Sequence, residues 1–175
     1  TIFSIVTTFR RSFYERGWLR AYRASVPVVV IGNLSVGGTG KSPLVAHVAA
    51  TLARRGLRPG ILLRGYGAAV RGPRRVSADT PVDEVGDEAV MLAAATGLPV
   101  VVSPERSAGA RLLETQGIDL ILCDDGLQHY ALARDIEVCV FDDRGVGNGW
   151  LLPAGPLREP WPRHVDLVLH TGLRP

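Results

Sequence analysis

The stretch from Pro27 to Pro43 constrains the fold of this chain most strongly. Its sequence, PVVVIGNLSVGGTGKSP, starts with four consecutive β-branched residues, which suit a strand buried on both faces of a sheet. It then turns through closely spaced glycines into Gly-Lys-Ser, and the run from Ser42 to Arg55 has the apolar spacing of an amphipathic helix. A strand, a glycine-rich turn and a helix in this order predict a phosphate-binding loop.

Each residue type in this loop suits phosphate binding. The glycines allow the backbone to curl until successive N–H groups converge on one anion, and the helix N-terminus adds its dipole. Lys41 reaches the outer phosphates, and the Ser42 hydroxyl is placed to bind Mg²⁺. The full pattern G-x-x-x-x-G-K-[ST] has glycine where Ser35 stands, and a strand-to-helix turn with an incidental lysine is the alternative. The residues expected to hold the nucleotide are Gly37, Gly38, Thr39, Gly40, Lys41 and Ser42.

A second informative stretch runs from 119 to 125, where four apolar residues lead into Asp124 and Asp125. An apolar strand that ends in carboxylates is the Walker B arrangement, in which a carboxylate helps to hold magnesium beside the phosphate loop. We therefore expect both aspartates to bind Mg²⁺ together with Ser42. His129 follows at the same end of the sheet, where a purely structural histidine is the alternative.

The rest of the chain alternates short apolar runs with amphipathic ones. Strands are predicted to begin at 61 and to span 99–102, 136–141 and 165–170, with helices from 87 to 95 and 105 to 116. The polar segment 68–84 is predicted to be a flexible loop, whose Arg71, Arg74 and Arg75 either meet phosphate or face solvent. This order predicts an α/β fold of the P-loop NTPase (Rossmann-like) class, with a mostly parallel sheet, helices on both faces and an N-terminal amphipathic helix before it.

Positive charge is concentrated at the N-terminus. Residues 1–25 hold five arginines and one glutamate, a net charge of +4 against +3 for the whole chain, which argues against a nucleic-acid partner. Aromatic and aliphatic residues recur there at three- and four-residue spacing. This pattern indicates a helix that either lies on an anionic membrane surface or packs against the protein. Residues 26–175 are predicted to form the phosphate-binding domain.

Cys123 and Cys139 lie in apolar strand-like runs without metal-binding spacing, which predicts reduced core thiols. Asp87 and Glu88 fall at the start of a predicted helix, where acidic residues commonly serve only the helix dipole.

A series of motifs spreads in order over residues 26–160: VPVVVIGNLSVGGTGKSP, LLRGYG, VGDE, SPERSAGA, CDDGLQH with RDIEVCVFD, and LLPAGPLREP. This series closely resembles the tetraacyldisaccharide 4′-kinases of lipid A biosynthesis. That family carries a small residue where Ser35 stands. Leu63 and Leu127 replace its usual Ser and Phe, and neither change removes a charged or phosphate-binding group.

The resemblance implies transfer of the ATP γ-phosphate to the 4′-hydroxyl of a tetraacylated glucosamine disaccharide 1-phosphate, which gives lipid IVA. It implies ATP and Mg²⁺ as cofactors, the acylated lipid and the membrane surface as partners, and the cytoplasmic face of the bacterial inner membrane as the location. No nucleic-acid or known protein partner is expected.

The resemblance also assigns roles to residues. Asp87 matches the catalytic aspartate, acting beside Lys41, and Glu88 matches its acidic neighbour at the metal. Positions expected at the substrate are Arg64, Tyr66, Gln128, His129, Arg158 and Glu159. A partner histidine of the family is expected in a C-terminal half beyond these 175 residues, so none of the histidines here is given its role.

Two other classes of protein remain as alternatives. A nucleotide-switch protein, such as a GTPase or an ATP-driven metal chaperone, would be supported by a guanine-reading [NT]-K-x-D segment, but Lys41 is the only lysine in the chain. A regulatory or scaffold domain that merely retains a nucleotide site is opposed by the acidic set at 87, 88, 124 and 125.

Overall fold

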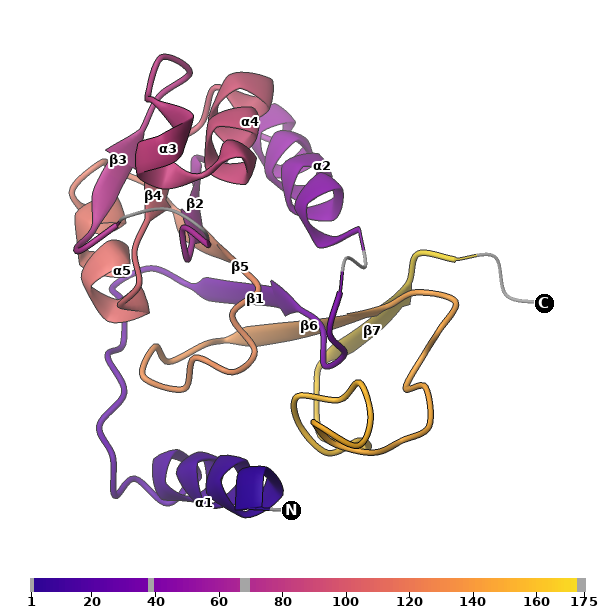
Figure 1. Ribbon diagram of the computed structural model, residues 1–175. Helices are drawn as coiled ribbons and strands as arrows, with labels where there is room; N and C mark the ends of the chain where they lie inside the picture. The colour runs from indigo at the N-terminus through magenta and orange to yellow at the C-terminus, as the bar shows by residue number, and fades with distance from the viewer. Residues whose placement is uncertain (1, 38–39, 67–69, 173–175) are drawn as a thin grey trace.

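A computed structural model describes residues 2–37, 40–66 and 70–172 (Figure 1). Its seven-stranded sheet has the order β3-β4-β2-β5-β1-β6-β7. The strands are β1 (Val28–Gly32), β2 (Pro59–Leu63), β3 (Arg74–Val76), β4 (Val100–Val102), β5 (Leu120–Asp124), β6 (Ile136–Phe141) and β7 (Leu167–His170). All neighbouring strands are parallel except β3, which pairs antiparallel with β4. The predicted α/β class with a mostly parallel sheet is confirmed.

Helices cover both faces of this sheet, with α2 and α4 on one side and α5 on the other (Figure 1). The helices are α1 (Ile2–Glu15), α2 (Lys41–Arg54), α3 (Val82–Val85), α4 (Asp87–Thr96) and α5 (Arg106–Glu114). Two hydrophobic cores result, one under α2 and α4 and one under α5 together with the segments that follow β5 and β6.

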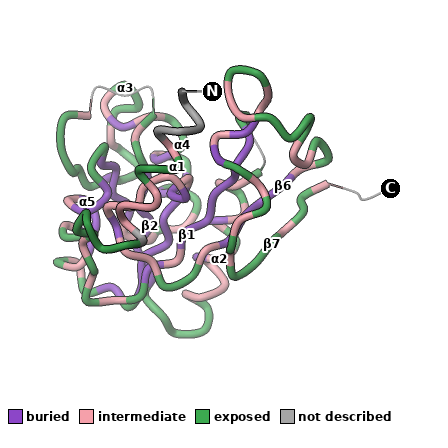
Figure 2. The backbone as a smooth tube through the Cα atoms, turned by 90° about the horizontal axis from the view of Figure 1, so that it is seen from below, coloured by how far each residue is buried: buried purple, intermediate pink, exposed green. Residues whose placement is uncertain are grey.

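The central strands divide their side chains between the two cores. In β5, Leu120 and Leu122 join the core under α2 and α4, whereas Ile121 and Cys123 join the core under α5. Alternate residues of a strand point to opposite faces, so a strand covered on both sides is apolar throughout. Figure 2 shows these strands as the buried centre of the molecule. Both cysteines are buried and free, as predicted.

The prediction that 68–84 is a flexible loop is wrong in part. Within it, Arg74–Val76 forms the edge strand β3 and Val82–Val85 forms α3. The buried side chains of Val76 and Val85 join the core, and Arg74 forms an ion pair with Glu84. Elements this short carry too few residues for a periodic signal, and tertiary packing forms them instead.

The N-terminal helix lies apart from the sheet and ends earlier than the predicted amphipathic stretch, at Glu15 (Figure 1). Gly17 has a left-handed backbone with φ 72°. The ring of Tyr14 stacks on Tyr130 with centroids 6.0 Å apart, and Tyr22 then pairs with the segment at 131–133. No described helix of the chain is both long enough and apolar enough to cross a membrane.

Candidate active site

A cavity of about 640 Å³ lies at the carboxyl ends of β2 and β5, beside the start of α2. Open α/β sheets bind ligands at this edge because the loops that follow parallel strands converge there. Its lining brings together ten residues predicted from sequence for the nucleotide, metal or substrate, namely Gly37, Gly40, Lys41, Ser42, Arg64, Tyr66, Glu88, Asp124, Asp125 and Arg158. Segments more than a hundred residues apart therefore meet at one site.

The phosphate loop enters α2 through Gly40, whose left-handed backbone (φ 73°) precedes the first helical residue, Lys41. The Lys41 ammonium donates a hydrogen bond to Asn33 Oδ1 at 3.0 Å and lies 3.7 Å from Asp125 Oδ1. Asn33 is fully buried at the end of β1, and its amide also donates to the carbonyl of Gly37 at 3.3 Å. The predicted nucleotide residues Gly38 and Thr39 lie outside the described residues.

Asp124 ends β5 as a buried carboxylate, only 3% exposed, and neither of its oxygens has a hydrogen-bond partner in the described chain. Burial, reinforced by the negative charge of Glu88, raises the pKa of Asp124 to about 6, although Lys41 and the nearby Ser42 hydroxyl oppose the shift. The nearby Ser42 hydroxyl donates to the Glu88 carboxylate. An unpartnered carboxylate, a hydroxyl and a second carboxylate provide the oxygen ligands that Mg²⁺ prefers.

These protein oxygens fit Mg²⁺ only if water and phosphate oxygens supply its other ligands. Among the side chains that the structure describes, no group of three or more His, Cys, Asp or Glu is arranged to hold a metal ion. In proteins Mg²⁺ commonly binds one or two carboxylates and completes its shell with water and substrate phosphates. Asp124 and Ser42 would hold the ion in that way.

Asp125 has a different environment from its neighbour. Its backbone is left-handed (φ 48°), and Arg158 grips both carboxylate oxygens, with Nη1 at 2.9 Å and Nη2 at 2.8 Å. Burial alone would raise the pKa of Asp125, but the hydrogen bonds and charge of Arg158, together with Lys41, lower it below its ordinary value. Asp125 therefore faces cations of the protein, whereas Asp124 has an unpartnered carboxylate.

Asp87 and Glu88 form the first turn of α4, and Asp87 Oδ1 accepts the backbone N–H of Glu88 at 2.8 Å. Asp87 is exposed and lines a smaller hollow of about 100 Å³ that shares Glu88 and Tyr66 with the main cavity. Tyr66 is 88% exposed. The predicted catalytic aspartate thus lies beside the main cavity, near Tyr66, which is expected to meet the substrate.

Gln128 and His129 lie in the segment that follows β5, and neither lines this cavity. The Gln128 amide donates to the carbonyl of Asn33 at 3.4 Å. Burial, reinforced by the positive charges of Arg106 and Arg64, lowers the pKa of His129 to about 4, so this histidine is neutral at pH 7.

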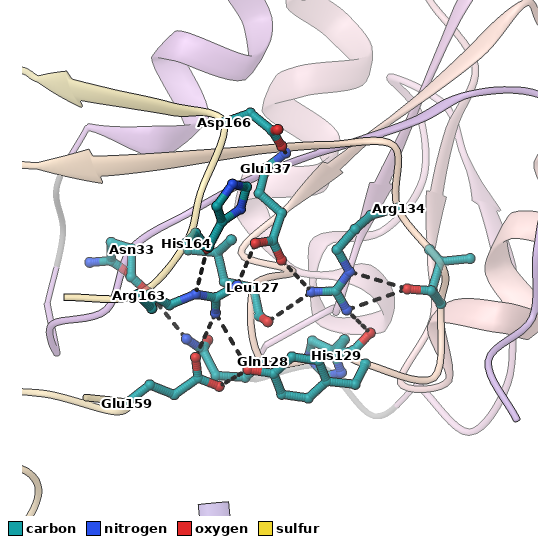
Figure 3. A network of polar contacts seen from close by, with 12 residues as sticks. Asn33, Leu127, Gln128, His129, Arg134, Glu137, Glu159, Arg163, His164 and Asp166 are labelled. Carbon is teal, nitrogen blue, oxygen red and sulfur yellow. Dashed lines mark hydrogen bonds and ion pairs between the residues drawn. The ribbon is translucent and has the colours of Figure 1, made fainter. Parts of the chain in front are cut away.

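Glu159 also lies away from the cavity, in a buried polar network (Figure 3). Its carboxylate accepts a hydrogen bond from the Tyr130 hydroxyl at 2.6 Å and another from Arg163 Nη1 at 2.7 Å. Arg163 also pairs with Glu137, which accepts a hydrogen bond from Arg134 at 2.8 Å. The network joins β6 to the segments on either side of it and supports the segment that presents Arg158.

Sequence reasoning missed Asn33 and Arg106, both of which are buried beside the predicted site. Asn33 offered a weak signal, since a polar residue directly after a buried strand is often functional. Arg106 lies within the motif SPERSAGA whereas the exposed Arg111 follows it, so membership of the motif was the one available signal, and no role was assigned from it.

A sequence profile described as tetraacyldisaccharide-1-P 4′-kinase matches residues 1–175. The chain belongs to this family. Among curated family members, the tetraacyldisaccharide 4′-kinase of Acidovorax sp. (strain JS42) is 53% identical over 176 residues, covering 99% of this chain and 52% of that protein. The one from Alkalilimnicola ehrlichii is 56% identical over 174 residues, covering 97% and 53%. The chain thus spans about half the length of these relatives.

A solved member of the family has the same fold. The crystal structure of LpxK from Aquifex aeolicus in complex with ATP superposes with a TM-score of 0.87 at 36% sequence identity, covering 96% of this chain and 55% of that one. The mostly parallel sheet and its helices are therefore those of a tetraacyldisaccharide-1-P 4′-kinase.

Proposed function

We propose that the protein phosphorylates the 4′-hydroxyl of a tetraacyl glucosamine disaccharide 1-phosphate with ATP, as the names of its relatives describe for them. The observation that carries the proposal is that the phosphate-loop residues Lys41 and Ser42 share one cavity with the unpartnered carboxylate of Asp124. Phosphoryl transfer requires positioning and charge neutralisation more than covalent chemistry.

On the donor side, the N-terminus of α2 and Lys41 bind the outer phosphates of ATP. Helix N-termini favour anions, and the lysine is close to the loop that presents the backbone N–H groups. Ser42 and Asp124 would hold Mg²⁺, which when bound neutralises charge on the transferred phosphate. Glu88 is near enough to orient the Ser42 hydroxyl through their hydrogen bond.

On the acceptor side, Asp87 is the proposed base. A sugar hydroxyl is a weak nucleophile at neutral pH, and a carboxylate within hydrogen-bond reach removes its proton as the new O–P bond forms. Asp87 is exposed. In its one described side-chain hydrogen bond, Oδ1 accepts the backbone N–H of Glu88, so Oδ2 remains for a substrate. Tyr66 lines the hollow beside Asp87 as well as the main cavity, and Arg64 lines the main cavity. Both would contact the disaccharide.

The N-terminal helix is proposed to bring the protein to a membrane surface at the cytoplasmic face of the inner membrane. Phe9 is 59% exposed and Trp18 is 66% exposed, and the ring of Phe13 is stacked on Trp18 and tilted against Phe9. Exposed aromatics interleaved with arginines suit the headgroup region of an anionic bilayer, where the acylated substrate also resides.

The test is transfer of radiolabelled γ-phosphate from ATP to the tetraacyldisaccharide 1-phosphate in the presence of Mg²⁺ by the full-length protein. We expect a product with phosphate at the 4′-position, no transfer to an acceptor that lacks the 4′-hydroxyl, and no transfer by Lys41→Ala. Asp87→Asn is expected to retain ATP binding while turnover falls at least about 100-fold. Nucleotide hydrolysis without lipid phosphorylation would refute the kinase and favour the nucleotide-switch alternative.

A further inference from the structure

Arg106 is a buried cation whose hydrogen-bonding capacity is largely unused. It is the first residue of α5, and only 2% of it is exposed. Its Nη2 donates to the backbone carbonyl of Asp124 at 2.7 Å. Its Nε and Nη1 are buried and have no partner within the described chain.

Such an arrangement is costly unless a ligand completes it. Buried polar groups are nearly always hydrogen-bonded, and a buried charge without a counter-charge strongly destabilises a fold. The guanidinium of arginine has five N–H donors and stays protonated at any ordinary pH. Arg106 therefore has more N–H donors than the described residues satisfy.

The carboxylates around the cavity do not use those donors. Asp125 is gripped by Arg158, and Glu88 accepts the hydroxyl of Ser42. Asp124 contacts Arg106 through its backbone carbonyl, and its side-chain oxygens have no hydrogen-bond partner among the described residues. Arg106 is thus a cavity-lining cation without a hydrogen-bonded carboxylate, in contrast to Arg158.

We propose that the free donors of Arg106 bind a phosphate group in the cavity, and that this group is the one transferred from the nucleotide. The inference rests on the proposed kinase function and adds a residue to its site. Arginine matches phosphate oxygens better than lysine does because its planar fork offers several directed N–H groups. Its position beside Asp124 places it where a metal-bound outer phosphate would lie.

The role of Arg106 in the reaction is electrostatic. The bond from the terminal phosphorus to the ADP oxygen breaks while a bond to the sugar oxygen forms, and the sugar proton leaves to a base. Arg106 neither gives nor takes a proton, because it remains a guanidinium throughout. Its N–H groups stabilise the charge on the phosphoryl oxygens as it is redistributed.

The test compares Arg106→Gln and Arg106→Lys with Arg111→Gln in the full-length protein. Arg111 is an exposed arginine of the same helix whose guanidinium lies 4.0 Å from the Tyr22 ring centroid, so its substitution removes the same charge outside the cavity. Dissociation constants for ADP and for a non-hydrolysable ATP analogue are measured with Mg²⁺, together with kcat and the KM of the lipid acceptor.

We expect Arg106→Gln to weaken binding of the ATP analogue at least about tenfold more than binding of ADP and to lower kcat roughly 100-fold. Arg106→Lys should recover part of both losses, and Arg111→Gln should stay within about twofold of wild type. If the analogue-to-ADP ratio is unchanged but the acceptor KM rises tenfold or more, the bound phosphate belongs to the lipid, which overturns the assignment to the nucleotide. If the dissociation constants, kcat and acceptor KM of the Arg106 variants all equalled those of wild type, Arg106 would not be a phosphate-binding residue.

Two controls keep the result interpretable. If Arg106→Gln fails to fold, the Arg106→Lys variant carries the test, since it retains the charge and loses the directed fork; wild-type ratios and kcat in that variant would then overturn the proposal. An active wild type with unaffected Arg106 variants refutes only this inference. A wild type that transfers no phosphate refutes the proposed function itself, and the inference with it.

Discussion

The guanidinium of Arg158 holds both carboxylate oxygens of Asp125, at 2.8 and 2.9 Å, and so joins the long segment between β6 and β7 to the end of β5. The same Nη2 group also donates to the carbonyl of Asn33 at 3.2 Å. One side chain thereby fixes the residues that follow the two central strands. Asp125 has the positive φ of 48° that is unusual for a residue with a side chain, and the clamp helps to maintain it.

We expect Arg158→Gln to weaken ATP binding about tenfold, because Asp125 would lose its partner and hold the Lys41 ammonium more strongly. Asp125→Asn should restore much of that affinity when combined with Arg158→Gln. Titration calorimetry of the four proteins in this double-mutant cycle measures the coupling, which should be about 1 kcal/mol because both side chains are partly exposed. Additive effects would show that Arg158 acts on the nucleotide directly.

Glu159 is expected to support the fold near the site without touching the lipid. Glu159→Gln leaves Arg163 buried with one carboxylate fewer, so the free energy of unfolding should fall by about 3 kcal/mol in urea denaturation. The KM for the lipid should not change in protein that remains folded. Tyr130→Phe removes a single hydrogen bond to the same carboxylate and should cost only about 1 kcal/mol. A raised lipid KM with unaltered stability would instead place Glu159 at the substrate.

Asp124 and His129 should give opposite dependences of stability on pH. The folded-state pKa of Asp124 is raised to about 6, so its buried charge costs increasing stability as pH rises from about 4 to 6, up to about 3 kcal/mol. The folded-state pKa of His129 is lowered to about 4, so the protein loses a similar amount of stability as pH falls from about 6.5 to 4.

Urea unfolding in EDTA between pH 4 and 7 separates the two contributions. Relative to wild type, Asp124→Asn should become more stable as pH rises, and His129→Gln should have its greatest relative stability at pH 4. The stability of the double variant relative to wild type should vary little with pH, because the two trends have opposite signs. If the relative stability of each single variant did not vary with pH, neither group would have the shifted pKa.

The exposed aromatics near the N-terminus are expected to determine membrane binding. Phe9→Ser combined with Trp18→Ser should reduce sedimentation with vesicles that contain phosphatidylglycerol at least about tenfold, because two large apolar side chains no longer enter the bilayer interface. Tyr14→Ser is the matched control, since this ring stacks on Tyr130 within the protein. An equal loss of vesicle binding in the double variant and in Tyr14→Ser would indicate that α1 only packs against the protein.

The strands and the phosphate loop could be predicted because their signals are local. Four β-branched residues before a glycine turn predict β1, and the apolar run before Asp124 predicts β5. The unused donors of Arg106 could not be predicted, since they depend on how α5 packs against β5. Arg158 and Glu159 illustrate the same limit: they are neighbours in sequence, yet one faces the cavity and the other a buried network.

The contact between Lys41 and Asp125 has a consequence for turnover. The ammonium that is proposed to bind the outer phosphates lies 3.7 Å from a carboxylate and donates to Asn33. A nucleotide phosphate must therefore displace the Asp125 carboxylate from Lys41, and the free energy of this displacement lowers the observed affinity for the nucleotide. When the product departs, the same carboxylate recaptures the lysine, so Asp125 would weaken product retention and favour the next catalytic cycle.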